Sequence, residues 1–416
     1  MSWYRAEAEV TEEEVAQRIA GAPGVFWLCD EGKVFLGAFP VEKSAQVDPL
    51  GEDECEDPDA QLWPLWVGVL PYEHFRFWER RGGAQTDPRE EPHLTEPVWQ
   101  RYEAVAQLNG ARLLVQGSNA VAVERLHSLL TTEKCRSSAS VELRWAESPE
   151  AGEIHRTRVR EALQLIASGE LYQVNLARRF QFHVAGGPIE LLRSLGKLAK
   201  APFAAALDLG EVKVVSTSPE LFLDCSPEGK VITRPIKGTR PRHSDTKMDA
   251  QLRRELEESE KERAELAMVI DIERNDLGRL AKTGSVKMLE GPHVVSYPTV
   301  HHREASVEAV IEKGVSRRDL ICGMMPSGSI TGAPKIAAMD VIHSLEAHRR
   351  GLYTGAIGFL THGGAMRLSM AIRVLTMKNN MAHYFAGGGI VADSDPEQEL
   401  QETRWKAEQL SALVRI

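Results

Sequence analysis

The second half of the chain consists largely of short strand-like runs separated by tight turns, and this pattern constrains the fold most. In the stretch PFAAALDLGEVKVVSTSPELFLDCSPEGKVITRPIKGT (Pro202 to Thr239), runs rich in Val, Leu, Phe and Ile are broken by Gly, Pro and Asp. The stretches GLYTGAIGFLTHGGAMRLSMAIRVLT and MAHYFAGGGIVADSD have the same character. Strands joined by turns this short usually pair as antiparallel hairpins. We therefore expect antiparallel sheet to dominate this part of the chain.

Helical patterns interrupt these strands at irregular intervals. Apolar residues at helical spacing predict helices over 153–170, from about 245 to 269, over 332–348 and over 396–416. A doubly wound sheet would need regular alternation of strand and helix, which the chain lacks. The sequence thus predicts an α+β fold.

The first 145 residues differ from the rest. They carry strand-like runs, GVFWLCD, KVFLGAFP and LWVGVLPYE, between polar, acidic and proline-containing stretches. A chain of 416 residues is long enough for two or three domain-sized units. We expect one region over 1–145 and a second over 150–416.

Composition excludes several classes of protein. A formal charge of −10 argues against a general nucleic-acid binder, because neutralising phosphates needs clustered Lys and Arg. No apolar run is long enough to predict a membrane span, and the acidic start MSWYRAEAEVTEEEVAQ lacks the apolar core of a secretory signal. Five scattered cysteines without a CxxC pair favour reduced thiols. We expect a cytoplasmic protein without a membrane or nucleic-acid partner.

Two pairs of glutamates could hold a cation. Glu262 and Glu265, and likewise Glu399 and Glu402, are three residues apart on predicted helices, so each pair shares a face. Lys406 follows Glu402 by one turn. Converging carboxylates repel one another unless a cation lies between them, and an all-oxygen ligand set suits Mg²⁺. The alternative is a pair of ordinary solvated helix faces.

Three glycine-rich stretches could bring backbone N–H groups close to an anion. These predicted turns are MMPSGSITGAPK (324–335), TGAIGF (354–359) and AGGGIV (386–391). The first runs into a predicted helix, whose N-terminus favours a carboxylate or phosphate. Its spacing is not that of a P-loop. Ordinary tight turns are the competing interpretation of each stretch.

Histidine and arginine residues in predicted strands offer further candidates. His301 and His302 are adjacent, so one is expected to face inward and the other outward. An inward histidine is either a general acid–base group or a satisfied core residue. Arg373, in MAIRVLT, is a charge within an apolar run. It needs a partner, either a substrate carboxylate or a structural ion pair.

Taken together, these motifs resemble the chorismate-utilising enzymes. The resemblance rests on GELYQVNLARRF, RPIKGTRPR, ELAMVIDIERNDLGRL, PSGSITGAPKIAAMDVI, GLYTGAIGF and AGGGIVADSDPEQELQET, and it covers roughly residues 150 to 416. It implies large mixed antiparallel sheets packed with helices, with a chorismate-binding catalytic domain over 150–416. Residues 1–145 are similar to the family's more variable region, in the branches known as component I.

The resemblance also implies a role for individual residues. Glu265 and Glu402 match the Mg²⁺ ligands, and Glu262 and Glu399 match the carboxylates beside them. Glu220 matches the carboxyl that protonates the departing hydroxyl, and a general acid with a raised pKa suits that role. His302 matches the histidine next to the reacting ring carbons. The positions that match substrate-binding residues are Gly328, Ser329, Ile330, Tyr353, Arg373, Gly387, Gly388, Gly389 and Lys406.

Two positions distinguish the branches of this family. Gln173 stands where the isochorismate and salicylate synthases usually have a lysine base, and glutamine cannot take a proton from water. Lys237 makes the motif PIKGT, which resembles the aminodeoxychorismate synthases, whereas anthranilate synthases usually have PIAGT. In the aminodeoxychorismate synthase branch, the resemblance implies that the neutral lysine amine is the nucleophile.

This branch implies a partner and a pathway. No cysteine lies in a Gly-rich nucleophile elbow, so the chain shows no glutaminase motif of its own. The resemblance implies a separate glutamine amidotransferase subunit that supplies ammonia in a heterodimer. The implied product is 4-amino-4-deoxychorismate, an intermediate of 4-aminobenzoate and folate biosynthesis. The alternatives are an anthranilate synthase component I with an unusual lysine, and an inactive paralogue with a regulatory role.

Overall fold

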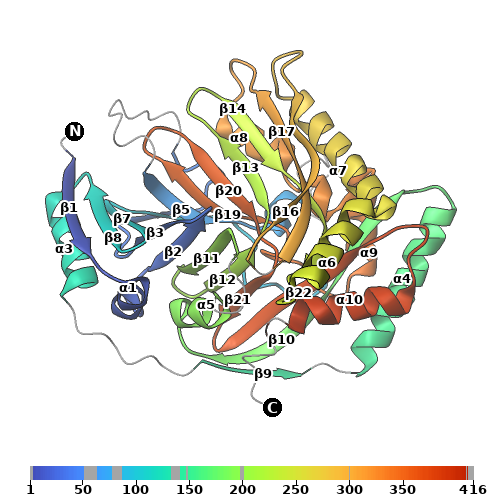
Figure 1. The fold of residues 1–416 in the computed structure, drawn as a ribbon, viewed down its shortest axis with the longest axis horizontal. Helices are drawn as coiled ribbons and strands as arrows, with labels where there is room; N and C mark the ends of the chain where they lie inside the picture. The colour runs from blue at the N-terminus through green and yellow to red at the C-terminus, as the bar shows by residue number, and fades with distance from the viewer. Residues whose placement is uncertain are drawn as a thin grey trace.

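The computed structural model describes residues 3–50, 63–76, 87–132, 141–146, 149–196, 201–298, 300–408 and 410. Within these ranges the strands form two large sheets, in which the paired strands run antiparallel (Figure 1). Helices pack around the sheets, and along the sequence they alternate irregularly with the strands (Figure 1). This arrangement confirms the predicted α+β fold.

The first sheet contains strands from both halves of the chain. Its order is β1 (Tyr4–Glu9), β8 (Arg112–Gly117), β7 (Ala104–Asn109), β3 (Lys33–Gly37), β2 (Phe26–Asp30), β11 (Phe203–Asp208), β12 (Lys213–Ser218), β21 (Val374–Lys378), β22 (Met381–Ile390), β10 (Gln173–Ala185) and β18 (Gly332–Ala333), with β9 (Glu142–Ala146) also paired to β10. The junction between the two halves is the β2–β11 pair, where Trp27 lies opposite Ala206.

The second sheet is likewise shared. Its order is β15 (Ile236–Pro241), β17 (Val300–Val310), β14 (Lys230–Arg234), β13 (Leu221–Cys225), β20 (Met366–Met370), β19 (Ala356–Thr361), β5 (Pro64–Leu70), β6 (Val98–Arg101) and β4 (Glu42–Ser44), with β16 (Lys287–Ser296) on β17. Here β19 pairs with β5, and Gly358 lies opposite Gly68. The division into regions 1–145 and 150–416 stays a prediction, but both sheets cross it.

The helices have the following bounds: α1 (Glu12–Ile19), α2 (Tyr72–Phe75), α3 (Ala120–Thr131), α4 (Pro149–Ala167), α5 (Pro188–Gly196), α6 (Thr246–Glu258), α7 (Glu260–Gly278), α8 (Arg317–Met324), α9 (Lys335–Leu345), α10 (Pro396–Glu408) and a 3₁₀ turn over Gly328–Ile330. Helices α6 and α7 pack on β15 and β17, and α10 packs on β22 and α4. Among the described residues, no helix is long and apolar enough to cross a membrane.

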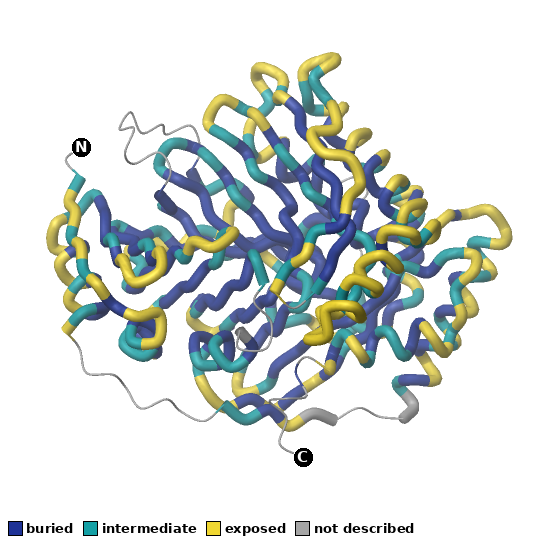
Figure 2. The backbone as a smooth tube through the Cα atoms, viewed as in Figure 1, coloured by how far each residue is buried: buried dark blue, intermediate teal, exposed yellow. Residues whose placement is uncertain are grey.

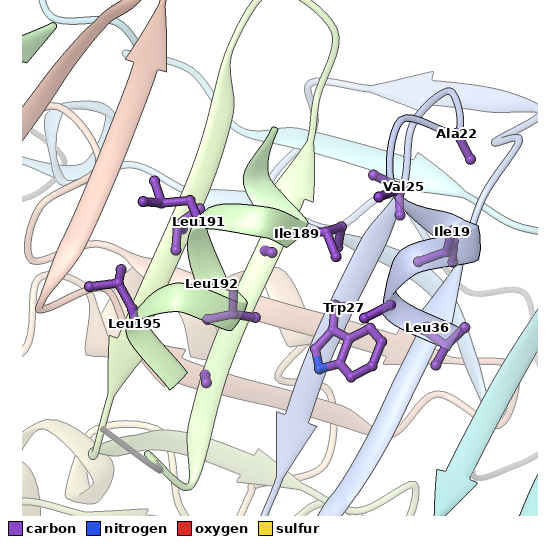
Figure 3. Close-up of a cluster of buried hydrophobic side chains, with 14 of the residues drawn as sticks. Ile19, Ala22, Val25, Trp27, Leu36, Ile189, Leu191, Leu192 and Leu195 are labelled. Carbon is purple, nitrogen blue, oxygen red and sulfur yellow. The ribbon is translucent and has the colours of Figure 1, made fainter. Parts of the chain in front are cut away.

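Buried side chains from distant parts of the sequence share one core. The central strands are buried, whereas the outer turns and much of α6 are exposed (Figure 2). Figure 3 shows Trp27 and Ile19 on one side of a cluster and Leu191 and Leu192 of α5 on the other. The N-terminal segment therefore packs directly against elements of the second region.

Most expected elements are present, but the charged helix predicted from about 245 to 269 is wrong as one element. The structure has two helices, α6 and α7, that meet at Ser259. Ser259 adopts an extended conformation, and its hydroxyl accepts a hydrogen bond from the backbone N–H of Glu262. A serine in this role ends one helix and begins the next. The last residues of the predicted helix over 396–416 lie outside the described ranges.

The adjacent histidines are both buried, which differs from the expectation of one outward residue. His301 and His302 of β17 are 2% and 1% exposed. The ring of His301 contacts Asp249 of α6 at 3.1 Å, so this helix covers the face that the sequence pattern left open.

Candidate active site

A cavity of about 540 Å³ lies where strands of the two sheets approach one another. Its walls come from β10 and β22 of the first sheet, β15 and β17 of the second, and helices α7 and α10. It is lined by nearly every predicted site residue: Glu220, Lys237, Glu262, Glu265, His302, Ser329, Ile330, Tyr353, Arg373, Gly387, Gly388, Gly389, Glu399, Glu402 and Lys406. Predicted residues up to 186 positions apart, Glu220 and Lys406, thus share one site.

Gly328 is the predicted site residue that does not line this cavity. A Cβ atom at this position would lie 2.3 Å from Cγ2 of Ile272 on α7. The glycine is therefore needed for close packing of the 3₁₀ turn on that helix. The start of α9, where the sequence suggested an anion site, also lies outside the lining, and Lys335 there pairs with Asp276 at 2.8 Å.

Glu220 is buried at the start of β13 and accepts a hydrogen bond from Ser329. The distance from Ser329 Oγ to Glu220 Oε1 is 2.9 Å. Burial raises the pKa of Glu220 to about 7, although Ser329, Lys237 and the backbone N–H of Ile236 favour the charged form. This carboxyl can hold or release a proton near neutral pH, as a general acid must.

Lys237 of β15 lies beside Glu220 on the same wall. Its ammonium group Nζ donates a hydrogen bond to the backbone oxygen of Ser329, at 3.1 Å. The side chain is half-buried and faces the cavity. Ser329 therefore contacts both residues, through its carbonyl and its hydroxyl.

His302 is neutral and has a ring nitrogen available to a ligand. Its Nδ1 lies 2.9 Å from Thr239 Oγ1, and Nε2 is buried without a hydrogen-bond partner in the described structure. Burial, and then the positive charge of Arg373, lower the pKa of His302 to about 3. An uncharged imidazole that faces the cavity can bind or orient a polar group of a substrate.

Arg373 presents a guanidinium without a protein partner. It follows β20 in a left-handed conformation, with φ 49°. Among the described residues no hydrogen bond or ion pair is found for its side chain, and burial lowers its pKa. Such a group is suited to an anionic ligand. Nearby Tyr353 stacks on Phe385 with ring centroids 5.4 Å apart, which gives the cavity an apolar wall.

The four predicted metal-site glutamates lie in the cavity but do not yet converge. In the described residues, no group of three or more His, Cys, Asp or Glu side chains is placed to hold an ion. Instead, Glu402 pairs with Lys406 at 2.6 Å, Glu262 with Arg240 at 3.4 Å, and Glu265 lies 4.0 Å from Lys261. Burial raises the pKa of Glu265 and of Glu399. The negative charges of Glu262 and Glu402 raise the pKa of Glu265 further, and the charge of Glu402 also raises the pKa of Glu399.

The donor set nevertheless fits a hard cation. Oxygen Oε2 of Glu399 is buried and finds no hydrogen-bond partner among the residues that the structure describes. A Cβ on Gly388 would lie 2.7 Å from this oxygen and 3.4 Å from Oε1 of Glu402, so the glycine lets both carboxylates approach β22. An orphaned oxygen of an acid whose pKa is raised, next to a second carboxylate, is where an added positive charge would be favourable.

The glycines expected to form turns at 386–391 lie inside a strand instead. Gly387, Gly388 and Gly389 belong to β22 and pair with β10. A Cβ on Gly389 would lie 2.1 Å from Nε2 of Gln173, and one on Gly387 would meet the backbone of β10. Glycine in a strand often marks such close approaches. The sequence pattern of three glycines suggested a turn because it does not reveal these neighbours.

Several lining residues were not predicted, among them Lys261, Arg240 and Trp405. Lys261 precedes Glu265 by one helical turn, and Trp405 follows Glu402 by three residues, so each shares a face with a predicted ligand. Helical spacing could therefore have identified both. Arg240 belongs to the quoted motif RPIKGTRPR, but only its contact with Glu262 reveals its place.

Comparison with known proteins adds the family. Residues 13–412 match the model of the chorismate binding enzymes. Anthranilate synthase component 1 of Thermus thermophilus is 42% identical over 264 residues, which cover 64% of this chain and 57% of the relative. Aminodeoxychorismate synthase component 1 of Escherichia coli is 43% identical over 246 residues, or 59% of this chain and 54% of the relative. The chain spans little more than half the length of these relatives.

Solved structures agree on the fold. Anthranilate synthase component I of Streptococcus pneumoniae superposes with a TM-score of 0.73 at 25% identity, covering 97% of this chain and 91% of the other. The menaquinone-specific isochorismate synthase of Escherichia coli gives 0.76 at 18% identity, covering 100% and 95%. The relatives carry two different activities at similar identity, but the family is common to them. The chain belongs to the chorismate binding enzymes.

Proposed function

We propose that this protein is component I of an aminodeoxychorismate synthase, which replaces the C4 hydroxyl of chorismate by an amino group. One observation carries the proposal: the amine of Lys237 and the carboxyl of Glu220 face the same cavity, on either side of Ser329. A nucleophile and a proton donor are thus paired at one site. Gln173, buried beside Gly389, supplies no base for water.

The proposed chemistry uses these two residues in turn. The neutral amine of Lys237 attacks ring C2, both ring double bonds shift by one position, and the C4–O bond breaks. Glu220 gives its proton to the departing hydroxyl, which leaves as water. Ammonia then attacks C4, both double bonds shift back, and the C2–N bond to Lys237 breaks. Glu220 takes up the proton that the new amine loses, and the free amine of Lys237 is restored.

The other cavity residues bind and orient the substrate. The guanidinium of Arg373 would pair with one carboxylate of chorismate, since it lacks a protein partner in the described structure. Nε2 of His302 is free to contact the ring substituents. Tyr353 and Phe385 form the apolar wall against which the ring can lie.

We propose Mg²⁺ as the cofactor, held by Glu265 and Glu402 with Glu262 and Glu399 beside them. The ion would supply positive charge to a substrate carboxylate. Lys261 and Lys406, which now pair with Glu265 and Glu402, would have to move aside. A glutamine amidotransferase subunit is the proposed source of ammonia, and folate biosynthesis in the cytoplasm the proposed setting.

The product identifies the branch. The purified chain is incubated with chorismate, Mg²⁺ and ammonium at alkaline pH, and the products are separated by chromatography and identified by mass spectrometry. We expect 4-amino-4-deoxychorismate. Anthranilate would instead support the second candidate, an anthranilate synthase component I. This candidate is favoured by relatives with that name, which have a similar identity to this chain.

Two variants then distinguish the role of Lys237 as a nucleophile from the role of its positive charge. Lys237→Ala removes the amine, and Lys237→Arg keeps a positive charge that does not attack carbon. Both should lose most of the 4-amino product. In the unmodified protein without ammonia, intact-protein mass spectrometry should find an adduct of chorismate minus water on Lys237. Normal 4-amino output from either variant would rule out this role for the lysine.

A further inference from the structure

Four buried side chains form a continuous hydrogen-bonded chain below the cavity. Ser329 Oγ lies 2.9 Å from Glu220 Oε1, Ser327 Oγ lies 3.0 Å from Ser329 Oγ, and Ser327 Oγ lies 2.6 Å from Glu273 Oε1. The chain begins at the cavity wall and ends on α7. Glu273 does not line the cavity and has no part in the chemistry proposed above.

This chain is almost completely buried, and its small exposure is greatest at the cavity end. The exposed fractions are 5% for Glu220 and Ser329, 2% for Ser327 and 1% for Glu273. The second carboxylate oxygen of Glu273, Oε2, is buried and has no hydrogen-bond partner in the described structure. A buried carboxyl that contacts one hydroxyl is costly to keep ionised. The reason for an acid at this position must therefore lie in the chain itself.

Counting hydrogens shows what the chain can hold. It has three contacts, and the two serine hydroxyls supply two hydrogens. If both glutamates are ionised, each serine donates to its carboxylate, and the contact between the serines lacks a hydrogen. One added proton fills all three contacts, because the hydroxyls can then all point the same way. A second added proton finds no unfilled contact, so it would have to sit on a carboxyl oxygen outside the chain, where for Glu273 it has no partner in the described structure.

We propose that Glu273 is a positioning residue which shares a single proton with Glu220 through Ser327 and Ser329. With the proton on Glu220, the hydroxyls point toward Glu273, and with the proton on Glu273 they point toward Glu220. The two arrangements interconvert when each of the three hydrogens moves along its contact, so one proton passes from one carboxyl to the other. This inference rests on the proposed function, in which Glu220 must be protonated before the C4–O bond breaks.

The charges around the two acids are compatible with sharing. Burial raises the pKa of both Glu220 and Glu273 to about 7, so the charged form is disfavoured at each end of the chain. Lys237 faces Glu220 from β15, whereas Glu273 faces Asp276 of its own helix and Lys335 of α9. Because Asp276 and Lys335 pair at 2.8 Å, their effects on Glu273 oppose each other.

The first test needs no activity. Infrared titration of the free protein follows the carbonyl absorption of protonated buried carboxyls, which Glu220→Gln and Glu273→Gln assign. We expect two protonation steps separated by more than about one pH unit, the behaviour of a coupled pair. Each Gln variant should shift the midpoint of the remaining acid downward. Overlapping steps, or a Glu220 midpoint that ignores Glu273→Gln, would overturn the proposal.

A double-mutant cycle tests the role of the Ser327 hydroxyl. Ser327→Ala should reduce the shift that Glu273→Gln causes at Glu220, whereas Ser327→Thr, which keeps a hydroxyl, should preserve it. An undiminished shift in Ser327→Ala would mean that the two acids interact only through space, contrary to the proposal. If Ser327→Ala does not fold, the two Gln variants still decide whether the acids are coupled.

The second test measures chorismate consumption with saturating ammonia as a function of pH. Glu220 acts as an acid, so kcat falls as pH rises through its pKa. Glu273→Gln removes a negative neighbour and should move this fall to lower pH by on the order of one unit, with KM unchanged. Glu304→Gln, a buried acid outside the chain, should not move it.

The two tests separate the two ideas. A pH profile that does not move in an otherwise active Glu273→Gln enzyme would overturn proton sharing and leave the proposed function intact. Coupled titration in a protein that does not aminate chorismate would support the shared proton and contradict the proposed function.

Discussion

Arg373 is a residue whose charge is expected to lower the stability of the free protein and to favour the binding of an anionic ligand. Its side chain is half-buried at the cavity and has no hydrogen-bond or ion-pair partner among the described residues, and its backbone is left-handed. An uncompensated buried charge destabilises the fold, and a ligand carboxylate would relieve it. The opposite interpretation from the sequence, a structural ion pair, finds no support in the described part of the protein.

Arg373→Met should therefore affect binding and stability in opposite directions. We expect KM for chorismate to rise about 10- to 100-fold, the loss of one charge-assisted hydrogen-bonding pair. The free energy of unfolding should stay equal or increase, because the unpaired charge is gone. Steady-state kinetics and urea denaturation measure the two quantities. A variant with unchanged KM would remove Arg373 from the substrate site.

Glu220 links the proposed chemistry to the pH dependence of stability. Burial raises its pKa from the ordinary 4.5 to about 7, so the folded state holds this proton more tightly than the unfolded chain. The stabilisation is complete below the unfolded pKa and is lost as pH rises through about 7. Glu220→Gln should flatten this decline by on the order of 1 to 3 kcal/mol between pH 5 and 8.

Urea denaturation of both proteins at several pH values checks this expectation. Comparison of the two slopes cancels the contribution of other titrating groups. Parallel curves for the variant and the unmodified protein would show that Glu220 titrates normally.

At the scale of elements, the sequence predicted types better than ends. Period-two and helical patterns located the strands of the hairpins and helices α4, α9 and α10, because these depend on local apolar spacing. The break at Ser259 was missed since serine is also common on exposed helices. The turn expected at Gly387 to Gly389 was wrong, although the surrounding run had been interpreted as strand, because the close contacts with β10 and α10 come from remote segments.

The candidate site was largely predictable for a related reason. Residues such as Lys237, Glu402 and Arg373 stand in motifs whose order resembles one family, and the structure brings them into one cavity. Glu273 was not singled out, although it lies in the motif DIERNDLGR. Only the three-dimensional contact with Ser327 gives it a possible role.

Strand β22 offers a test of the metal proposal at this scale. Gly388→Ala would place a methyl group 2.7 Å from Oε2 of Glu399. Because that oxygen ends a flexible side chain, the carboxylate can move while the strand keeps its pairing. We expect a loss of Mg²⁺ affinity of about tenfold or more by calorimetry, with little change in melting temperature. Gly291→Ala, which has nothing within 4 Å, is the matched control.

The outcome separates packing from coordination. If Gly388→Ala binds Mg²⁺ as well as the Gly291→Ala control, then the carboxylates of Glu399 and Glu402 do not need this approach to β22. If both variants lose stability, backbone strain rather than the metal site explains the effect.

At the scale of the whole molecule, the boundary near residue 145 divides the sequence but not the hydrophobic core. Strand β11 pairs with β2 and β19 with β5, so each sheet would gain an unpaired edge if the first region were removed. Buried residues from both regions share clusters, including Trp27 with Leu191 and Val69 with Ile357. The cavity lining found among the described residues comes from the second region, from Asn175 to Lys406.

A fragment of residues 150–416 should therefore carry the cavity residues but fail to fold alone. Removal of 1–145 exposes the apolar faces of α5 and β11 and leaves strand edges that favour aggregation. We expect no cooperative urea transition from this fragment, and recovery of one when residues 1–145 are co-expressed as a separate chain. A stable fragment that binds chorismate alone would show that the second region is an autonomous domain, and that the shared sheets contribute little to its stability.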